Sequence, residues 1–249
     1  MDLLLAVASG IGIGSVLGFV GAGGSMLAVP IFIYVFGLTP TTAPTASLLV
    51  VFVGALSGVL PKLRSKEVLI KEALVIWAIG LATNLSGAYF LPLIPEKIVL
   101  TGFALVLVSA GISMLIPTPS QVTERKVSPI ALIAISLVIG ALTGLFGIGG
   151  GFLAIPILIL FFNVSPVKAA GTSLFIITIN TLTGFFAHYR HWSDVDWSLP
   201  IVIAAVALFV SRIASHRSSH LSPKTLKRAF AYFVFAIALF TLFETWVIA

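Results

Sequence analysis

Two short clusters of glycine carry the clearest chemistry in this sequence. One contains Gly21, Gly23 and Gly24, and the other contains Gly147 and residues 149–151. A helix that begins directly after such a cluster leaves its first backbone N–H groups unbonded, at the positive end of the helix dipole. Glycine also lets a ligand approach the backbone closely. The clusters therefore predict a binding site for a small anion.

Hydroxyl, amide and guanidinium side chains near the clusters could add hydrogen bonds to that anion. The complete set of candidate substrate-binding residues is Gly23, Gly24, Ser25, Ser47, Gly149, Gly150, Gly151, Thr172, Ser173, Asn84, Asn180 and Arg190. A structural alternative applies to most of them. Glycines permit close helix crossings, and polar side chains bond neighbouring helices inside a membrane.

The elements that must position these residues are apolar. The chain has 249 residues, of which 59% are apolar and 9% charged, whereas a soluble domain is about 45–50% apolar and about 25% charged. No Asp, Glu, Lys or Arg occurs between Leu3 and Pro61. Roughly 20 apolar residues cross a bilayer, so the sequence predicts a membrane protein with several spans.

Charge and side-chain chemistry exclude several classes of function. The net charge of +6 lies in short loops between apolar segments, where Lys and Arg report membrane orientation rather than nucleic-acid binding. Cysteine is absent, all four histidines lie between 188 and 220, and no Asp or Glu lies in the interior of an expected span. We therefore expect neither an enzyme nor a protein that holds a metal or cofactor.

The chain is an internal duplication. Residues 14–31 and 140–157 align without a gap at a shift of 126 residues, and half of their positions are identical. The matched pairs include Gly14 and Gly140, Pro30 and Pro156, Ser47 and Ser173, and Arg64 and Arg190. We predict a first repeat over 1–116, a linker loop over 117–127 and a second repeat over 128–249.

Charges and prolines divide the chain into ten apolar segments. They lie near 3–20, 25–37, 43–61, 73–91, 98–116, 128–146, 152–163, 169–187, 198–211 and 229–247. The second and the seventh reach only roughly 20 Å as helices, against a hydrocarbon core of about 30 Å. Each follows a glycine cluster and contains a proline, so each is expected to be a short, broken helix.

The distribution of basic residues predicts how the segments cross. If the short segments cross, 12 of the 14 Lys and Arg residues lie in loops on one side; if they turn back, the division is even. The positive-inside rule selects the first arrangement. It predicts an all-α protein of the cell membrane with about ten segments in two inverted five-segment repeats and both termini outside. Eight spans with two re-entrant segments is the alternative.

Three motifs carry a resemblance to a known family. They are GAGG at 21–24 before Pro30, GIGGG at 147–151 before Pro156, and GTS at 171–173. Together they resemble the TauE/SafE sulfite exporter family over essentially the whole chain. The resemblance implies a membrane transporter of small anions such as sulfite, sulfonates or related organosulfur acids. The first copy departs from the pattern at Ser25 and Pro44, so strict twofold symmetry of the site is not expected.

Membrane energetics favour export. An anion that leaves a cell with a negative interior gains about 2.3 kcal/mol per charge per 100 mV, so export needs no coupled ion. A relay of ionisable residues inside the spans is not expected either. The sequence thus predicts export of a small sulfur-containing anion. Ion-coupled uptake and a passive anion channel are the alternatives.

Overall fold

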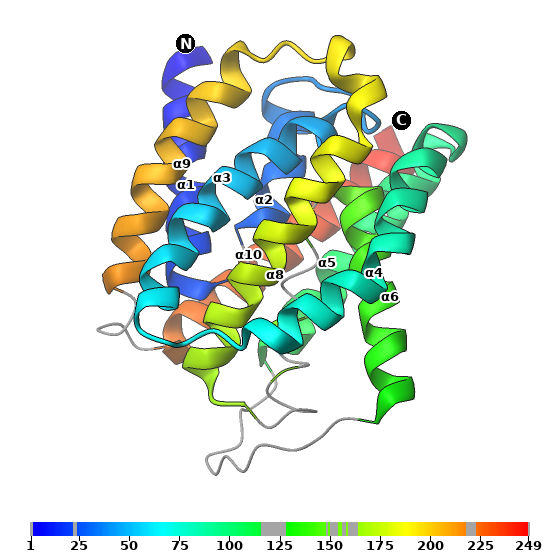
Figure 1. Cartoon of the computed structure of the whole chain (residues 1–249). Helices are drawn as coiled ribbons and strands as arrows, with labels where there is room; N and C mark the ends of the chain where they lie inside the picture. The colour runs from blue at the N-terminus through cyan, green and yellow to red at the C-terminus, as the bar shows by residue number, and fades with distance from the viewer. Residues whose placement is uncertain are drawn as a thin grey trace.

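The computed structural model describes residues 2–21, 24–115, 128–147, 149, 154–155, 158, 164–217 and 223–248. These residues form helices and their connections, which confirms the all-α class (Figure 1). The α-helices are α1 (Asp2–Val20), α2 (Ser25–Pro30), α3 (Ala43–Arg64), α4 (Ile70–Phe90), α5 (Glu96–Leu115), α6 (Pro129–Phe146), α8 (Pro166–Ala187), α9 (Ser198–Arg217) and α10 (Pro223–Phe243). Shorter π or 3₁₀ turns are η1 (Ile31–Val35), η2 (Leu91–Leu93), η3 (Tyr189–Asp194) and η5 (Glu244–Ile248).

Six of the described helices are long and apolar enough to cross a membrane, namely α1, α3, α4, α6, α8 and α9. The short segment expected at 25–37 is α2 continued by η1, which together form a short apolar helix. Most of the short segment expected at 152–163 lies outside the described residues. The count of ten segments therefore stays a prediction.

Two helices form the centre of the bundle. In α3 and α8, 72% and 61% of the apolar window is buried, against 33–39% in the other four long helices. The two central helices contact each other, and α9 and α4 pack on their outer sides. Large apolar side chains such as Leu4, Ile130 and Phe209 are exposed on the outer helices, as expected where lipid replaces water.

The remaining helix pairs match each other across the duplication. α1 packs on α9, and its counterpart α6 packs on α4. Gly14 and Gly18 lie against the carbonyls of Ala207 and Ser211, just as Gly140 and Gly144 lie against those of Gly80 and Asn84. Close crossing of this kind requires small residues. In these contacts Gly80 and Asn84 of α4 take the places of Ala207 and Ser211 of α9. α4 and α9 thus correspond at a shift of 127 residues, one residue more than the shift of 126 that relates the other helices.

Gly140 should be intolerant of any side chain. A Cβ there would collide with the carbonyl of Gly80 and lie 2.5 Å from Thr83 Oγ1. We expect Gly140→Ala to lower the free energy of unfolding by about 1–3 kcal/mol, the usual cost of overpacking. The loss is measured as the midpoint of thermal unfolding of the purified protein in detergent.

Gly12 provides the matched control for Gly140→Ala. It lies within α1, and a Cβ there would meet no atom within 4 Å. Gly12→Ala should be neutral, or stabilising by up to about 1 kcal/mol because alanine favours helix. Equal unfolding midpoints for the two variants would mean that the α4–α6 crossing is not as close as described.

Candidate functional site

The two glycine clusters meet the central helices of the opposite half of the chain. Gly21 directly follows α1 and Gly147 directly follows α6, and both glycines have a positive φ, 83° and 65°. A Cβ on Gly21 would lie 2.8 Å from Ala170 Cβ at the start of α8, and one on Gly147 would lie 2.8 Å from Pro44 Cα at the start of α3. Each cluster thus faces the helix start of the other repeat, not its own.

Within the clusters, the described glycines are packed against helices. Gly24 lies on α1, where a Cβ would come within 2.6 Å of Leu17 Cγ. Gly149, with φ 69°, lies 2.9 Å by the same measure from the side chains of Ile177 and Thr181 in α8. Close packing on α1 is enough to explain why residue 24 is a glycine. Gly149 instead lies beside the turn of α8 that also contains Asn180. Gly23, Gly150, Gly151 and the side chain of Ser25 lie outside what the structure describes.

The predicted hydroxyl donors are buried and engaged with protein. Ser47 Oγ donates to the carbonyl of Gly147 at 3.2 Å, which fixes the second cluster on α3. Thr172 Oγ1 accepts from the backbone N–H of Leu69 at 2.9 Å, in the connection between α3 and α4. Ser173 is also buried and has an interaction partner. The side chains of Ser47 and Thr172 therefore support the helix starts in this conformation.

Asn84 and Asn180 are brought together between α4 and α8. Asn84 Nδ2 donates to the carbonyl of Asn180 at 3.0 Å and to Thr183 Oγ1 at 3.1 Å. Both side chains are fully or almost fully buried. Among the described residues, Asn84 Oδ1 and both polar atoms of Asn180 have no hydrogen-bond partner. Unsatisfied buried polar atoms are costly, so they indicate a place for a ligand or water.

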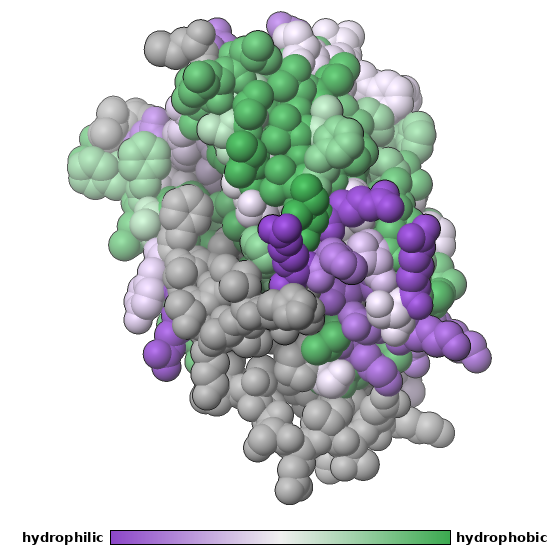
Figure 2. Space-filling model, turned by 90° about the vertical axis from the view of Figure 1, so that its left-hand side faces the viewer, coloured by the Kyte–Doolittle hydropathy of each residue, from purple (hydrophilic) through white to green (hydrophobic). Residues whose placement is uncertain are grey.

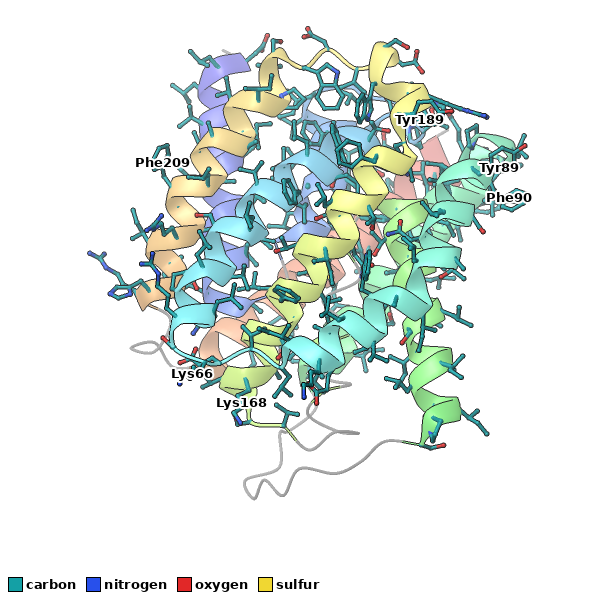
Figure 3. The ribbon with its side chains drawn as sticks, viewed as in Figure 1. Lys66, Tyr89, Phe90, Lys168, Tyr189 and Phe209 are labelled. Carbon is teal, nitrogen blue, oxygen red and sulfur yellow. The ribbon has the colours of Figure 1, made fainter. Side chains whose placement is uncertain are left out.

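A pocket of about 610 Å³ lies between the upper ends of α4 and α8, above this pair. Its polar lining includes Arg190, Tyr89, Tyr189, His191 and Thr183. The guanidinium of Arg190 lies 5.8 Å from the ring centroids of both tyrosines, and its Nε donates to Tyr189 Oη at 3.3 Å. Figure 3 shows Tyr89 and Tyr189 at the same end of the bundle.

Thr183 connects the pocket to the asparagine pair, because its side chain lines the pocket and its Oγ1 accepts a hydrogen bond from Asn84. Sequence reasoning missed Thr183 and Tyr89. Thr183 could have been found, since it lies three residues after Asn180 on the same face of an apolar helix. Tyr89 could not, because only the packing of α4 beside α8 brings it to Arg190.

His188 ties three helices together just beyond the end of α8. Its Nε2 donates to the carbonyl of Gly144 at 2.9 Å, so its Nδ1 accepts from Thr45 Oγ1 at 3.0 Å. Burial lowers the pKa of His188 from 6.5 to about 4, although the bond to Gly144 acts in the opposite direction. His188 is therefore neutral at pH 7. It holds the last turn of α6, which leads into the second cluster, against the start of α3, and it does not line the pocket.

This burial predicts an acid-dependent loss of stability. Because the pKa of His188 is lower in the folded protein, the unfolded chain takes up a proton first as the pH falls below 6.5. The free energy of unfolding should drop by about 1.4 kcal/mol per pH unit between pH 6.5 and about 4. The His188→Gln variant should lack this contribution. Parallel stability curves for the two proteins in detergent would contradict the prediction.

Glu244 qualifies the expectation that no carboxylate lies inside a span. It begins η5 at the end of α10, within a short apolar helix, and interacts electrostatically with Tyr34. Its Oε2 is buried without a hydrogen-bond partner among the described residues. No group of three or more residues suited to a metal ion occurs in the part of the chain that was described.

Comparison with known proteins identifies relatives that are named as probable membrane transporters. A probable membrane transporter protein of Xylella fastidiosa (strain 9a5c) is 28% identical over 98% of this chain and 97% of its own. The probable membrane transporter protein YunE of Bacillus subtilis is 26% identical over 91% of this chain and 92% of its own. No solved structure matches.

A probable membrane transporter protein of Methanocaldococcus jannaschii, MJ0441, is 33% identical over 44% of this chain and 43% of its own. The model of the family described as sulfite exporter TauE/SafE matches residues 6–241, nearly the whole chain. The relatives are membrane transporters and not enzymes. The chain therefore belongs to the TauE/SafE sulfite exporter family of membrane transporters.

Proposed function

We propose that this transporter carries small sulfur-containing anions, such as sulfite, a sulfonate or a related organosulfur acid, out of the cell. The observation that carries the proposal is the buried amide of Asn180, whose two polar atoms have no partner among the described residues. It lies beside Asn84 and below a pocket that contains Arg190. An amide N–H donor at the bottom and a guanidinium at the entrance suit a small oxyanion.

The anion would enter past Arg190 and reach the asparagines by way of Thr183. A guanidinium at the mouth raises the local concentration of anions. Gly149, Gly150 and Gly151 would line the far side, since Gly149 packs on the same turn of α8. Gly23, Gly24, Ser25, Ser47, Thr172 and Ser173 would hold the two helix starts in place, and their hydroxyl groups would contact the anion only after rearrangement.

The membrane arrangement that we propose is ten segments in two inverted repeats, 1–116 and 128–249, joined by the linker 117–127. The matched helix pairs support it. In Figure 1 both termini lie at the upper end, whereas Figure 3 places Lys66 and Lys168 at the lower end. By the positive-inside rule the lower end faces the cytoplasm and both termini lie outside.

Export is favoured by the membrane potential, which supplies about 2.3 kcal/mol per charge per 100 mV for an anion that leaves the cytoplasm. Ion-coupled uptake is the second candidate, because Glu244 is a partly buried carboxylate within an apolar helix. A passive anion channel is a third. Flux measurements separate the three.

The test is flux in proteoliposomes that contain the purified protein. Efflux of radiolabelled sulfite, methanesulfonate and sulfoacetate is measured under an imposed potential, with and without gradients of protons or sodium. We expect potential-driven flux that needs no ion gradient, saturates with anion concentration and is lowered in Arg190→Gln. Accumulation against the potential only when an ion gradient is present would show a symporter. Unsaturable flux would show a channel, and no flux of any of these anions would refute the proposed substrate class.

A further inference from the structure

A second pocket lies at the basic end of the bundle, between the lower ends of α3 and α9. It measures about 340 Å³ and is lined by Leu60, Pro61, Arg64, Ser65, Arg212 and His216. Figure 2 shows hydrophilic side chains gathered below the apolar surface of this side of the molecule. The pocket thus combines two guanidinium groups, an imidazole and a hydroxyl.

Every residue of this basic-end pocket has a counterpart in the larger pocket beside Arg190. At the shift of 126 residues, Arg64 and Ser65 of the α3 end match Arg190 and His191. At the shift of 127 residues that relates α4 to α9, Arg212 and His216 match Leu85 and Tyr89. Leu60 and Pro61 match Phe186 and Ala187. The two pockets are the same feature of the duplicated fold, formed at opposite ends.

The two pockets differ in volume and in the hydrogen bonds made by the hydroxyl side chain next to each of them. Thr183 lines the larger pocket and donates only to carbonyls of its own helix, those of Ile179 and Asn180. Its counterpart Ser57 instead donates across to the carbonyl of Leu208 in α9 at 2.6 Å. Ser215 of α9 donates back to the carbonyl of Gly58 at 2.8 Å. These two bonds close the contact between α3 and α9, which we call the α3–α9 seam.

A buried polar atom lies behind the closed seam. Ser211, the counterpart of Asn84, is fully buried, and its Oγ has no hydrogen-bond partner among the described residues. It lies 2.7 Å from where a Cβ of Gly58 would be, just as Asn84 Oδ1 lies 3.2 Å from the equivalent point of Gly184. The seam thus hides a polar group that matches the one below the open pocket.

We propose that the basic-end pocket binds small oxyanions and is the second mouth of the transport path. This inference rests on the proposed function. Arg64 and Arg212 are the groups that recognise the anion, because guanidinium matches the geometry of an oxyanion and cannot lose its charge. Opening of the α3–α9 seam connects this mouth to Ser211, while closure of α4 on α8 seals the other mouth. Glu67, a carboxylate of the nearby α3–α4 connection, is paired with Lys62 at 2.9 Å.

The natural absence of cysteine permits a direct test of this pocket. A single cysteine replaces Ser65, and its rates of reaction with a sulfonatoethyl and a trimethylammonium-ethyl methanethiosulfonate are compared. The first reagent is a sulfonate anion and the second is a cation of similar size. We expect the anion-to-cation rate ratio to fall at least fivefold in Arg64→Gln and in Arg212→Gln. Sulfoacetate should slow the reaction with the sulfonate reagent.

Arg217→Gln is the matched control, since Arg217 is exposed on the same helix but does not line the pocket. It should change the rate ratio less than twofold. If Arg64→Gln or Arg212→Gln behaves like Arg217→Gln, the pocket is not an anion site and the inference is wrong. The reaction needs no transport, so this result is independent of the flux measurement. If the anion-to-cation rate ratio is unchanged in Arg64→Gln and Arg212→Gln while the parent protein transports the anions, only the second mouth is refuted. If the ratio falls in these variants but the parent protein shows no flux, only the proposed function is refuted.

Discussion

A disulfide between α3 and α9 should stop transport completely and reversibly. In the double variant Gly58→Cys, Ser211→Cys, the two side chains face each other across the seam, because a Cβ on Gly58 lies 2.7 Å from Ser211 Oγ. This separation is within reach of a disulfide. A covalent bond there prevents α3 from parting from α9, so the basic-end mouth cannot open. We expect flux to fall more than tenfold on oxidation.

Reduction provides the internal control for this cross-link. Since the chain has no other cysteine, the oxidised double variant forms only this one intramolecular bond. Dithiothreitol should restore its flux, and the two single variants should not respond to oxidant. Full flux through completely cross-linked protein would show that the seam does not open during transport. Loss of flux in the reduced protein alone would show that Gly58 tolerates no side chain, which its close contact with a flexible serine argues against.

The sequence predicted those parts of the fold that can be recognised from the internal duplication and from the pattern of hydropathy. The glycine breaks at Gly21 and Gly147 and the short helix after residue 25 are present. The close helix crossings that glycines permit are also present, as Gly14 and Gly18 show. These features are local, or they repeat at one fixed shift, so one sequence is enough to find them.

The sequence could not predict which helices meet across the two halves. The expected anion site placed the clusters together with Ser47 and Thr172. In the structure Gly21 and Gly147 pack on the start of the central helix of the other half, whereas Gly149 packs on α8 of its own half. The hydroxyl of Ser47 is used by the carbonyl of Gly147. Packing between helices that are distant in the sequence decides which of the candidate polar side chains lie together. Asn84 and Asn180 were individually visible, but their contact depends on α4 lying beside α8.

The two halves also differ in a way that no repeat in the sequence predicts. Ser57 and Ser215 join α3 to α9 beside the pocket of about 340 Å³, whereas α4 and α8 are joined through Asn84 below the pocket of about 610 Å³. The residues at this contact also differ between the halves, because Ser57, Ser211 and Ser215 stand where the other half has Thr183, Asn84 and Ala88. Part of the difference between the pockets therefore follows from the side chains, since Ala88 cannot make the hydrogen bond that Ser215 makes.

Asn180→Leu should separate function from stability. Its amide makes no side-chain hydrogen bond within the described structure, and it is 99% buried. Leucine has a similar volume and carries no polar atom, so the variant should fold and be as stable as the parent or more so. A hydrogen bond to a charged ligand contributes about 1.5–3 kcal/mol. Loss of the amide should therefore lower anion flux at subsaturating concentration by roughly 10- to 100-fold.

Asn84→Leu is the informative comparison, because Asn84 holds α4 to α8 through Asn180 and Thr183. Removing it should lower both the unfolding midpoint and the flux, as a structural residue would. A residue that only packs would lose stability together with activity, whereas Asn180→Leu should lose activity alone. Flux in Asn180→Leu equal to that of the parent would place the anion elsewhere in the bundle. The opposite response of stability and flux at this one position is what distinguishes a ligand contact from a helix contact.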